Sequence, residues 1–269
     1  MKKTLLSVVA LDSLFVAFLM LSGLFGGVIS DIIYFSAFIL PFVVFLLAKQ
    51  RFGDEKHRLS VVPGGATLGI TASVTAPTVL IVFVMSMLSS LVVSLFADAP
   101  VTELEGSFLS LLFLHALVPA VLEEALFRYI PLTLITPHSR KCAVFFSAML
   151  FALAHCNIAQ MPYALVAGLI FAWCDLATDS IAPSVILHFV NNVAAIVWQR
   201  YVLGTEHETA FIVTMVLLAA LSAVPMFLLR RRIAASLTFL RDKADRIVIT
   251  REVALYAIVT VGFALIIIL

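Results

Sequence analysis

Two adjacent carboxylates and a guanidinium interrupt a long apolar stretch, and this interruption limits what the chain can fold into. Glu123, Glu124 and Arg128 lie inside a largely apolar run from Phe108 to Ile135. A charge at bilayer depth costs at least about 2.5 kcal/mol. On a helix, Glu124 and Arg128 lie one turn apart on the same face and can pair, whereas Glu123 is rotated by about 100°. We therefore expect Arg128 to hold one carboxylate while the other points into a cavity.

The composition places such a chain in a membrane. Of its 269 residues, 63% are hydrophobic and 12% are charged, and the mean hydropathy is +1.15. A soluble domain has about 45–50% apolar and about 25% charged residues. The formal net charge of +1 gives no reason to expect nucleic-acid binding. Three cysteines without C-x-x-C spacing are expected to be buried free thiols rather than a disulfide or a metal cluster.

The hydropathy pattern predicts an all-α, polytopic transmembrane helical bundle of eight or nine spans that forms a single membrane domain over residues 1–269. The candidate spans, each of about 17–25 residues, are approximately Leu5–Phe25, Ile32–Ala48, Ile70–Phe96, Phe108–Ile135, Cys142–Cys156, Met161–Leu176, Ile181–Tyr201, Phe211–Leu229 and Val253–Leu269. The fifth is short, and Pro119 is expected to kink the fourth. No small-residue cleavage site follows the first span, so no cleavable signal peptide is expected.

Basic residues predict the orientation, because cytoplasmic loops carry an excess of Lys and Arg. With the N-terminus in the cytoplasm and nine spans, the outer side receives only Arg200, Arg128 is intramembrane, and the C-terminus lies outside. The remaining basic residues fall on the inner side: Lys2, Lys3, Lys49, Arg51, Lys56, Arg58, Arg140, Lys141, Arg230, Arg231, Arg232, Arg241, Lys243, Arg246 and Arg251. Residues 230–251 are interpreted as a basic cytoplasmic loop that contacts anionic lipid headgroups, not nucleic acid.

Two further polar groups lie in later spans. His155 follows Phe151 by four residues near the end of the fifth span, and His188 and Asn192 have the same spacing in the seventh. His188 and Asn192 can therefore face one cavity, while Asn191 is expected to point elsewhere. A single histidine or asparagine in a membrane is often only a helix–helix hydrogen-bonding residue. Several such groups in three spans indicate a shared interior or a watery cavity.

This set of side chains has the equipment for amide hydrolysis. Apolar surroundings disfavour the charged form of a glutamate, which suits the group to accept a proton as a general base. A nearby histidine can share the water molecule or relay its proton. A second histidine with an asparagine supplies donors for a developing oxyanion. No serine or cysteine nucleophile is required.

Three motifs in chain order resemble those of one known family. They are Glu123-Glu124-x-x-x-Arg128, Phe151-x-x-x-His155 and His188-x-x-x-Asn192. They are similar to the motifs of the CPBP family, the CAAX prenyl protease 2-like (type II CAAX) intramembrane proteases, also called the Abi family. The resemblance covers about residues 108–198, which we interpret as the catalytic core.

The resemblance implies an intramembrane endopeptidase that acts on a membrane-associated protein or peptide through a glutamate-activated water. It implies that Glu123 is the general base, that His155 binds and polarises the water, and that His188 and Asn192 stabilise the oxyanion. Glu124 is a candidate second catalytic carboxylate. The residues implied to order the site are Glu124, Arg128 and, in the second motif, Phe151.

A metal site is the less favoured interpretation of the same residues. The sequence has no H-E-x-x-H motif, although Glu123, His155 and His188 are a conceivable zinc-ligand set with an open water position. We therefore expect a glutamate mechanism without a cofactor, with zinc as the alternative. We also expect one geometric difficulty, because His155 should lie nearer the outer face than His188, so the fifth span must be shifted if the residues are to meet.

A non-catalytic protein is the alternative class, either an ion-coupled transporter or an immunity or scaffold protein. Intramembrane carboxylates and histidines also form proton relays, but the chain shows no convincing internal repeat of the kind found in many transporters. It also lacks the Gly-x-Ser-Gly and Gly-x-Gly-Asp stretches of other intramembrane proteases. With no organelle signal visible, a prokaryotic cell (inner) membrane is the expected location.

Overall fold

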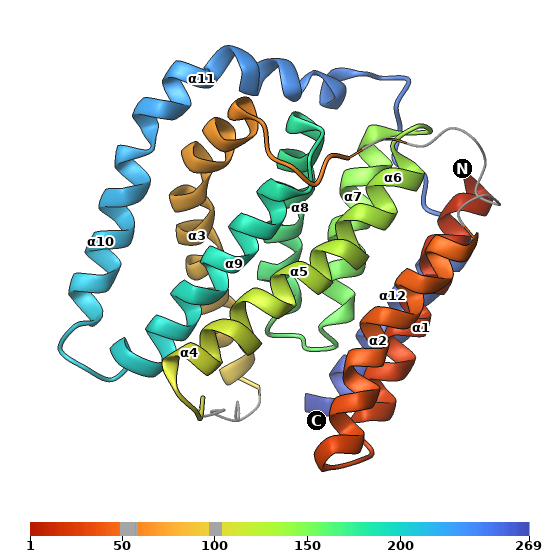
Figure 1. Ribbon diagram of the computed structural model, residues 1–269, viewed down its shortest axis with the longest axis horizontal. Helices are drawn as coiled ribbons and strands as arrows, with labels where there is room; N and C mark the ends of the chain where they lie inside the picture. Colours follow the sequence, from red (N-terminus) through yellow and green to blue (C-terminus); the bar gives the residue numbers. More distant parts are fainter. Residues whose placement is uncertain (49–56, 58, 97–103, 269) are drawn as a thin grey trace.

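The computed structural model describes residues 1–48, 57, 59–96 and 104–268, and these residues form a bundle of helices (Figure 1). The first helices are α1 (Lys2–Ser22), α2 (Gly27–Ala48) and α3 (Gly65–Ser94). The last are α10 (Glu208–Leu221), α11 (Ala223–Ser236), the short η5 (Thr238–Arg241) and α12 (Arg251–Ile268). The expected all-α membrane architecture is confirmed.

The central part of the chain carries the motifs. A segment that we call the broken helix runs over Phe108–Ile135 and comprises α4 (Phe108–Leu111), η2 (Leu112–Leu117), α5 (Val118–Glu124), η3 (Ala125–Tyr129) and α6 (Ile130–Ile135). It is followed by α7 (Arg140–Ala154), α8 (Met161–Thr178), α9 (Ala182–Val197) and η4 (Trp198–Val202).

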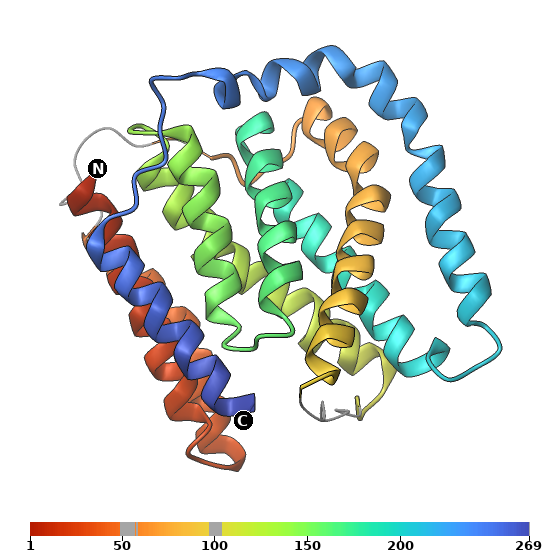
Figure 2. The ribbon, with the colours of Figure 1, turned by 180° about the vertical axis from the view of Figure 1, so that it is seen from behind.

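Fewer helices can cross a membrane by their own length and composition than the nine that the sequence predicts. Within the described residues, five are long and apolar enough: α1, α2, α3, the broken helix and α8, with a sixth if α10 and α11, bent by 45°, form one span. α7 has 15 residues, fewer than the roughly 20 needed to span. α9 runs on without a break into η4 as far as Val202, but this longer segment carries the polar residues His188, Asn191 and Asn192. The described ends of the chain nevertheless lie at opposite ends of the bundle (Figures 1 and 2), as an odd number of crossings requires.

The broken helix changes its winding on both sides of the two glutamates. η2 and η3 are π-helical, and α5 between them begins with a proline at its first turn. That proline, Pro119, has no N–H to donate, so the altered winding occurs at the place where the sequence predicted a kink. Single π-helical turns are frequent at functional sites, and here they bracket Glu123 and Glu124.

α7 and α8 form a closely packed hairpin in the middle of the molecule. A side chain on Gly168 of α8 would place its Cβ 2.9 Å from the Cα of Ala148 in α7, so only glycine permits this approach. α7 starts at the Ser139 cap, whose hydroxyl accepts from the Cys142 N–H at 2.9 Å, and ends before His155. Its length of about 22 Å leaves the α7–α8 turn short of the level that the α1–α2 turn reaches (Figure 1).

The N- and C-terminal helices form a separate group at one side. α1, α2 and α12 lie together beside the α7 side of the core (Figures 1 and 2). Asp12 of α1 is buried and accepts a hydrogen bond from the Tyr256 hydroxyl of α12. Lys2 pairs with Glu252 at 3.4 Å at the ends of the same two helices. All three helices contact the core: α1 contacts α6 and α7, α2 contacts η3, and α12 contacts α7.

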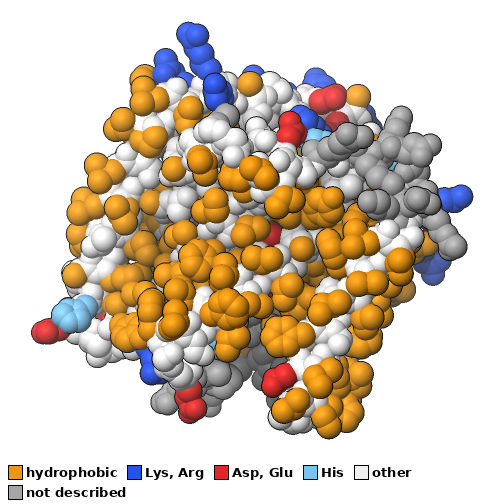
Figure 3. All heavy atoms as spheres, in the orientation of Figure 1, with side chains coloured by type: hydrophobic (Ala, Val, Ile, Leu, Met, Phe, Trp, Pro, Cys, Tyr) orange, Lys and Arg blue, Asp and Glu red, His pale blue; other side chains and the backbone are white. Residues whose placement is uncertain are grey.

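The two ends of the bundle differ in charge. We call one the basic end, where α11 lies across the helices (Figure 1) and most Lys and Arg side chains gather (Figure 3). Residues 230–251, expected to be a loop, begin there as the continuation of α11 to Ser236. The opposite end, the Arg200 end, holds Arg200, which donates to the backbone carbonyls of Leu104 and Gly106. Lys49, Arg51, Lys56 and Arg58, also expected at the basic side, lie outside the described residues.

Candidate active site

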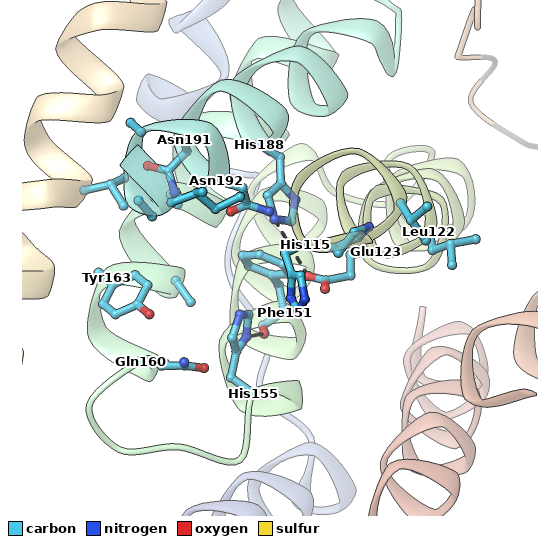
Figure 4. A pocket seen from close by; sticks show the side chains of 18 of the residues that line it. His115, Leu122, Glu123, Phe151, His155, Gln160, Tyr163, His188, Asn191 and Asn192 are labelled. Atoms are coloured by element: carbon cyan, nitrogen blue, oxygen red, sulfur yellow. Dashed lines mark hydrogen bonds and ion pairs between the residues drawn. The ribbon is translucent and has the colours of Figure 1, made fainter. Parts of the chain in front are cut away.

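A cavity of about 770 Å³ lies between six helical segments, and each of the three motifs contributes polar residues to its wall. Figure 4 shows it from close by, with Glu123 on the broken helix facing the histidines of α7 and α9. Among the residues that line it are Glu123, Phe151, His155, His188 and Asn192. The convergence that the sequence predicted therefore occurs. His155 lies directly after the last residue of α7, and its ring is held against the preceding turn, with Nδ1 2.7 Å from the Phe151 carbonyl.

Glu124 is buried between two cationic or hydrogen-bonding partners. Its side chain is fully buried, as is that of Arg128. Oε2 of Glu124 lies 3.1 Å from Nε of Arg128, and Oε1 lies 2.8 Å from Nδ1 of His188. The predicted pairing of Arg128 with one carboxylate is confirmed, and the chosen carboxylate is that of Glu124. The Glu124 carboxylate contacts Arg128 and His188 and does not line the cavity.

Glu123 has the opposite environment. Its side chain is 17% exposed and lines the cavity, and its Oε2 lies 3.9 Å from Nε2 of His188. At that distance no direct hydrogen bond forms. A carboxylate oxygen is thus presented to the cavity beside a histidine, with room for a third group to contact both.

Hydrogen bonds fix how the two histidines present their rings. Nδ1 of His155 lies 2.7 Å from the backbone carbonyl of Phe151, which can only accept, so Nδ1 carries the proton and Nε2 is left for the cavity. Nδ1 of His188 faces the Glu124 carboxylate in the same way. A buried partner on one ring nitrogen determines the role of the other. In both rings Nε2 is therefore the nitrogen that is presented to the cavity.

Aromatic rings hold these polar groups in place. The guanidinium of Arg128 lies 4.2 Å from the ring centre of Phe151 and 5.6 Å from that of Phe171. Phe151 also meets His155 and His188 edge-on, with ring centres 4.8 and 5.5 Å apart. A cation over an aromatic face is stabilised most where water is excluded. Phe151 of the second motif therefore contacts every other motif through its ring.

Asp175 of α8 belongs to this arrangement and was missed by the sequence interpretation. It is fully buried, and its Oδ1 accepts from the backbone N–H of Ser184 at 3.0 Å. Ser184 lies in the first turn of α9, one turn before His188, so Asp175 satisfies a free amide at that helix start. The available signal was a lone carboxylate inside the apolar sixth span, which marks a functional position.

Other polar residues reach the cavity without belonging to a motif. His115, Gln160 and Tyr163 line it, and Figure 4 shows them around the same space. Asn191 also lines it, so the expectation that Asn191 points elsewhere is wrong. Positions three and four residues after His188 both lie near its face of the helix, and the cavity is wide enough to receive both side chains.

The candidate zinc ligands do not form a metal site in this arrangement. Across residues 1–48, 57, 59–96 and 104–268, no group of three or more His, Cys, Asp or Glu side chains is placed to hold a metal ion. Of the three candidates, His188 has Nδ1 on Glu124 and Nε2 3.9 Å from Glu123. The cysteines are free thiols, as expected: Cys142 and Cys174 are buried and Cys156 is half-buried.

Comparison with known proteins supports the resemblance seen in the motifs. Residues 105–194 match the family model described as type II CAAX prenyl endopeptidase Rce1-like. This segment contains every motif residue and most of the cavity wall. No curated protein and no solved structure matches the chain significantly.

Proposed function

We propose that the cavity is the active site of an intramembrane endopeptidase in which Glu123 activates a water molecule. The match of residues 105–194 to the type II CAAX prenyl endopeptidase family supports a CAAX-type intramembrane protease. The observation that carries the mechanism is the contrast between the two glutamates. Glu124 is buried against Arg128 and His188, whereas the Glu123 carboxylate is presented to the cavity.

The proposed reaction assigns one task to each side chain. Glu123 takes a proton from a water held also by Nε2 of His155, and the water oxygen attacks the scissile carbonyl carbon. The charge that develops on the carbonyl oxygen is stabilised by the amide N–H of Asn192 and by Nε2–H of His188. Because Nδ1–H of His188 is held by Glu124, this role requires the doubly protonated imidazolium form of His188. Glu123 then returns the proton to the leaving amine. The substrate is a membrane-associated protein or peptide, and the enzyme is an integral membrane protein.

Glu124 and Arg128 act through position rather than through contact with substrate. Glu124 accepts from Nδ1 of His188 and thereby aims Nε2 of that ring at the cavity. Arg128 neutralises Glu124 and stacks on Phe151. Neither side chain lines the cavity. Glu124 therefore orients His188, and Glu123 transfers the proton.

The test compares protein termini in cells that carry the wild type, Glu123→Gln or Glu206→Gln at matched levels. Glu123→Gln keeps the shape of the side chain and removes its basicity, so new termini found with the wild type should disappear. Glu206 is exposed and outside the cavity, so its variant should leave them unchanged. Identical termini in all three strains would overturn the proposal.

The proposed mechanism needs no metal ion, and treatment with a chelator tests this. A purified preparation that cleaves a substrate found in this way should keep its rate after prolonged incubation with a chelator. Loss of the rate, restored by added zinc and not by calcium, would show that the water is activated by a metal instead of by Glu123 alone.

A further inference from the structure

The cavity occupies only one half of the bundle. Its lining residues come from positions 31–38 of α2, 79–86 of α3, 104–123 in and before the broken helix, 151–155 at the end of α7, 160–171 in and before α8, and 188–199 in α9 and η4. α3, α7 and α9 run away from the basic end, and their lining residues come late in the helix. α2, the broken helix and α8 run back toward it, and their lining residues come early. The cavity therefore extends from the depth of Glu123 toward the Arg200 end.

The other half of the bundle is filled and covered. Between the cavity and the basic end lie fully buried side chains, among them Leu132, Ile135 and Asp175. His57 and Ser60 contact the bundle at this end. The His57 N–H donates to the Thr133 carbonyl at 3.1 Å, and Ser60 exchanges backbone hydrogen bonds of 2.8 and 3.0 Å with the α8–α9 turn. These contacts join the residues before α3 to α6 and to the α8–α9 turn.

The open half carries carboxyl groups. Asp31 near the start of α2 and Glu123 both line the cavity. Among the lining residues that the structure describes there is no Lys or Arg. A site with this charge disfavours a substrate carboxylate near the reacting bond, because like charges repel strongly where water is scarce.

We infer that the active site opens to the extracytoplasmic side and cleaves internal bonds in extracytoplasmic segments of membrane-anchored polypeptides. This inference rests on the proposed function and on the excess of basic residues that marks the cytoplasmic side of a membrane protein. The basic end then faces the cytoplasm, and the cavity faces away from it. A segment leaving the outer membrane surface enters without crossing the bilayer, whereas a free C-terminal carboxylate beside the scissile bond meets no Lys or Arg in the described wall.

Thiol labelling tests the direction of opening without relying on activity. Ser86 lines the cavity and is outside the proposed catalytic set, and Ala244 is exposed near the basic end. Ser86→Cys and Ala244→Cys are made in a chain whose three cysteines are replaced, and intact cells are treated with a membrane-impermeant maleimide. Ser86→Cys should label in intact cells, and Ala244→Cys only after the membrane is opened. Labelling of Ser86→Cys only after opening, or not at all, would overturn the inference.

The positions of the cleavage products test the substrate class. Termini that require an intact Glu123 should lie in extracytoplasmic segments and more than three residues from the original C-terminus. Dependent termini in cytoplasmic segments, or removal of a C-terminal tripeptide, would refute this part even if labelling gave the expected pattern. Absence of any dependent terminus would instead refute the proposed function, and the labelling result would still decide the direction of opening.

Discussion

Replacing Arg128 by methionine should destabilise the protein more than almost any other single change. The side chain is fully buried, lies 3.1 Å from Glu124 and stacks on Phe151 at 4.2 Å. Methionine keeps much of the apolar stem but leaves the Glu124 carboxylate buried without its cation. Breaking a buried ion pair from one side costs about 3–5 kcal/mol, which corresponds to a loss of about 6–20 °C in Tm for a chain of this size.

The assay is thermal unfolding of the purified protein in detergent, followed for the wild type and three variants. Arg128→Met should show the full loss, and Arg128→Met with Glu124→Gln should recover at least half of it, because no unpaired charge then remains. Lys2→Met is the control, since its pair with Glu252 is exposed and should leave Tm nearly unchanged. Equal losses in the single and double variants would refute the reasoning and assign the effect to lost packing on Phe151.

Three further perturbations test the α7–α8 hairpin, the contact between α1 and α12, and His57. Gly168→Ala should lower the free energy of unfolding by about 1–3 kcal/mol and reduce cleavage, because a new Cβ would lie 2.9 Å from α7; Gly262→Ala, with open space around it, should be tolerated in the same thermal assay. Tyr256→Phe should cost about 1–3 kcal/mol, because the buried Asp12 loses its donor; an unchanged Tm would contradict this. Burial lowers the pKa of the His57 imidazole from its usual 6.5, so the unfolded chain binds more protons and stability should fall as the pH drops below about 6.5; His57→Gln should flatten this dependence in unfolding curves, and an unaltered slope would exclude His57 as its source.

The local spacing of charged residues predicted one ion pair and the direction of one carboxylate correctly. Glu124 and Arg128 are four residues apart and pair, and Glu123, one step away, faces the cavity. This succeeded even though η3 is π-helical, because the pair needs only to share a face. His188 and Asn192 also share a face, as their spacing required.

Tertiary packing decided what the spacing left open. The place of the His155 ring depends on its contact with the Phe151 carbonyl and on the packing of α7 in the bundle, which hydropathy does not predict. Asn191 was not expected in the cavity because only the four-residue spacing of His188 and Asn192 was taken to define the cavity face, but the cavity also receives the residue three positions after His188. Asp175 acts on α9 from another helix, and the helical periodicity of a single segment contains no information about that contact.

The link between α1 and α12 sets a requirement on the order of synthesis. Asp12 and Tyr256, which form that link, are 244 residues apart in the chain. At about 5–20 residues per second on the ribosome, the Asp12 carboxyl waits about 12–49 s for its donor. Every motif residue from Glu123 to Asn192 is made during that interval. The helices that carry the motifs therefore emerge while Asp12 of α1 still lacks its donor, and α12 closes the assembly last.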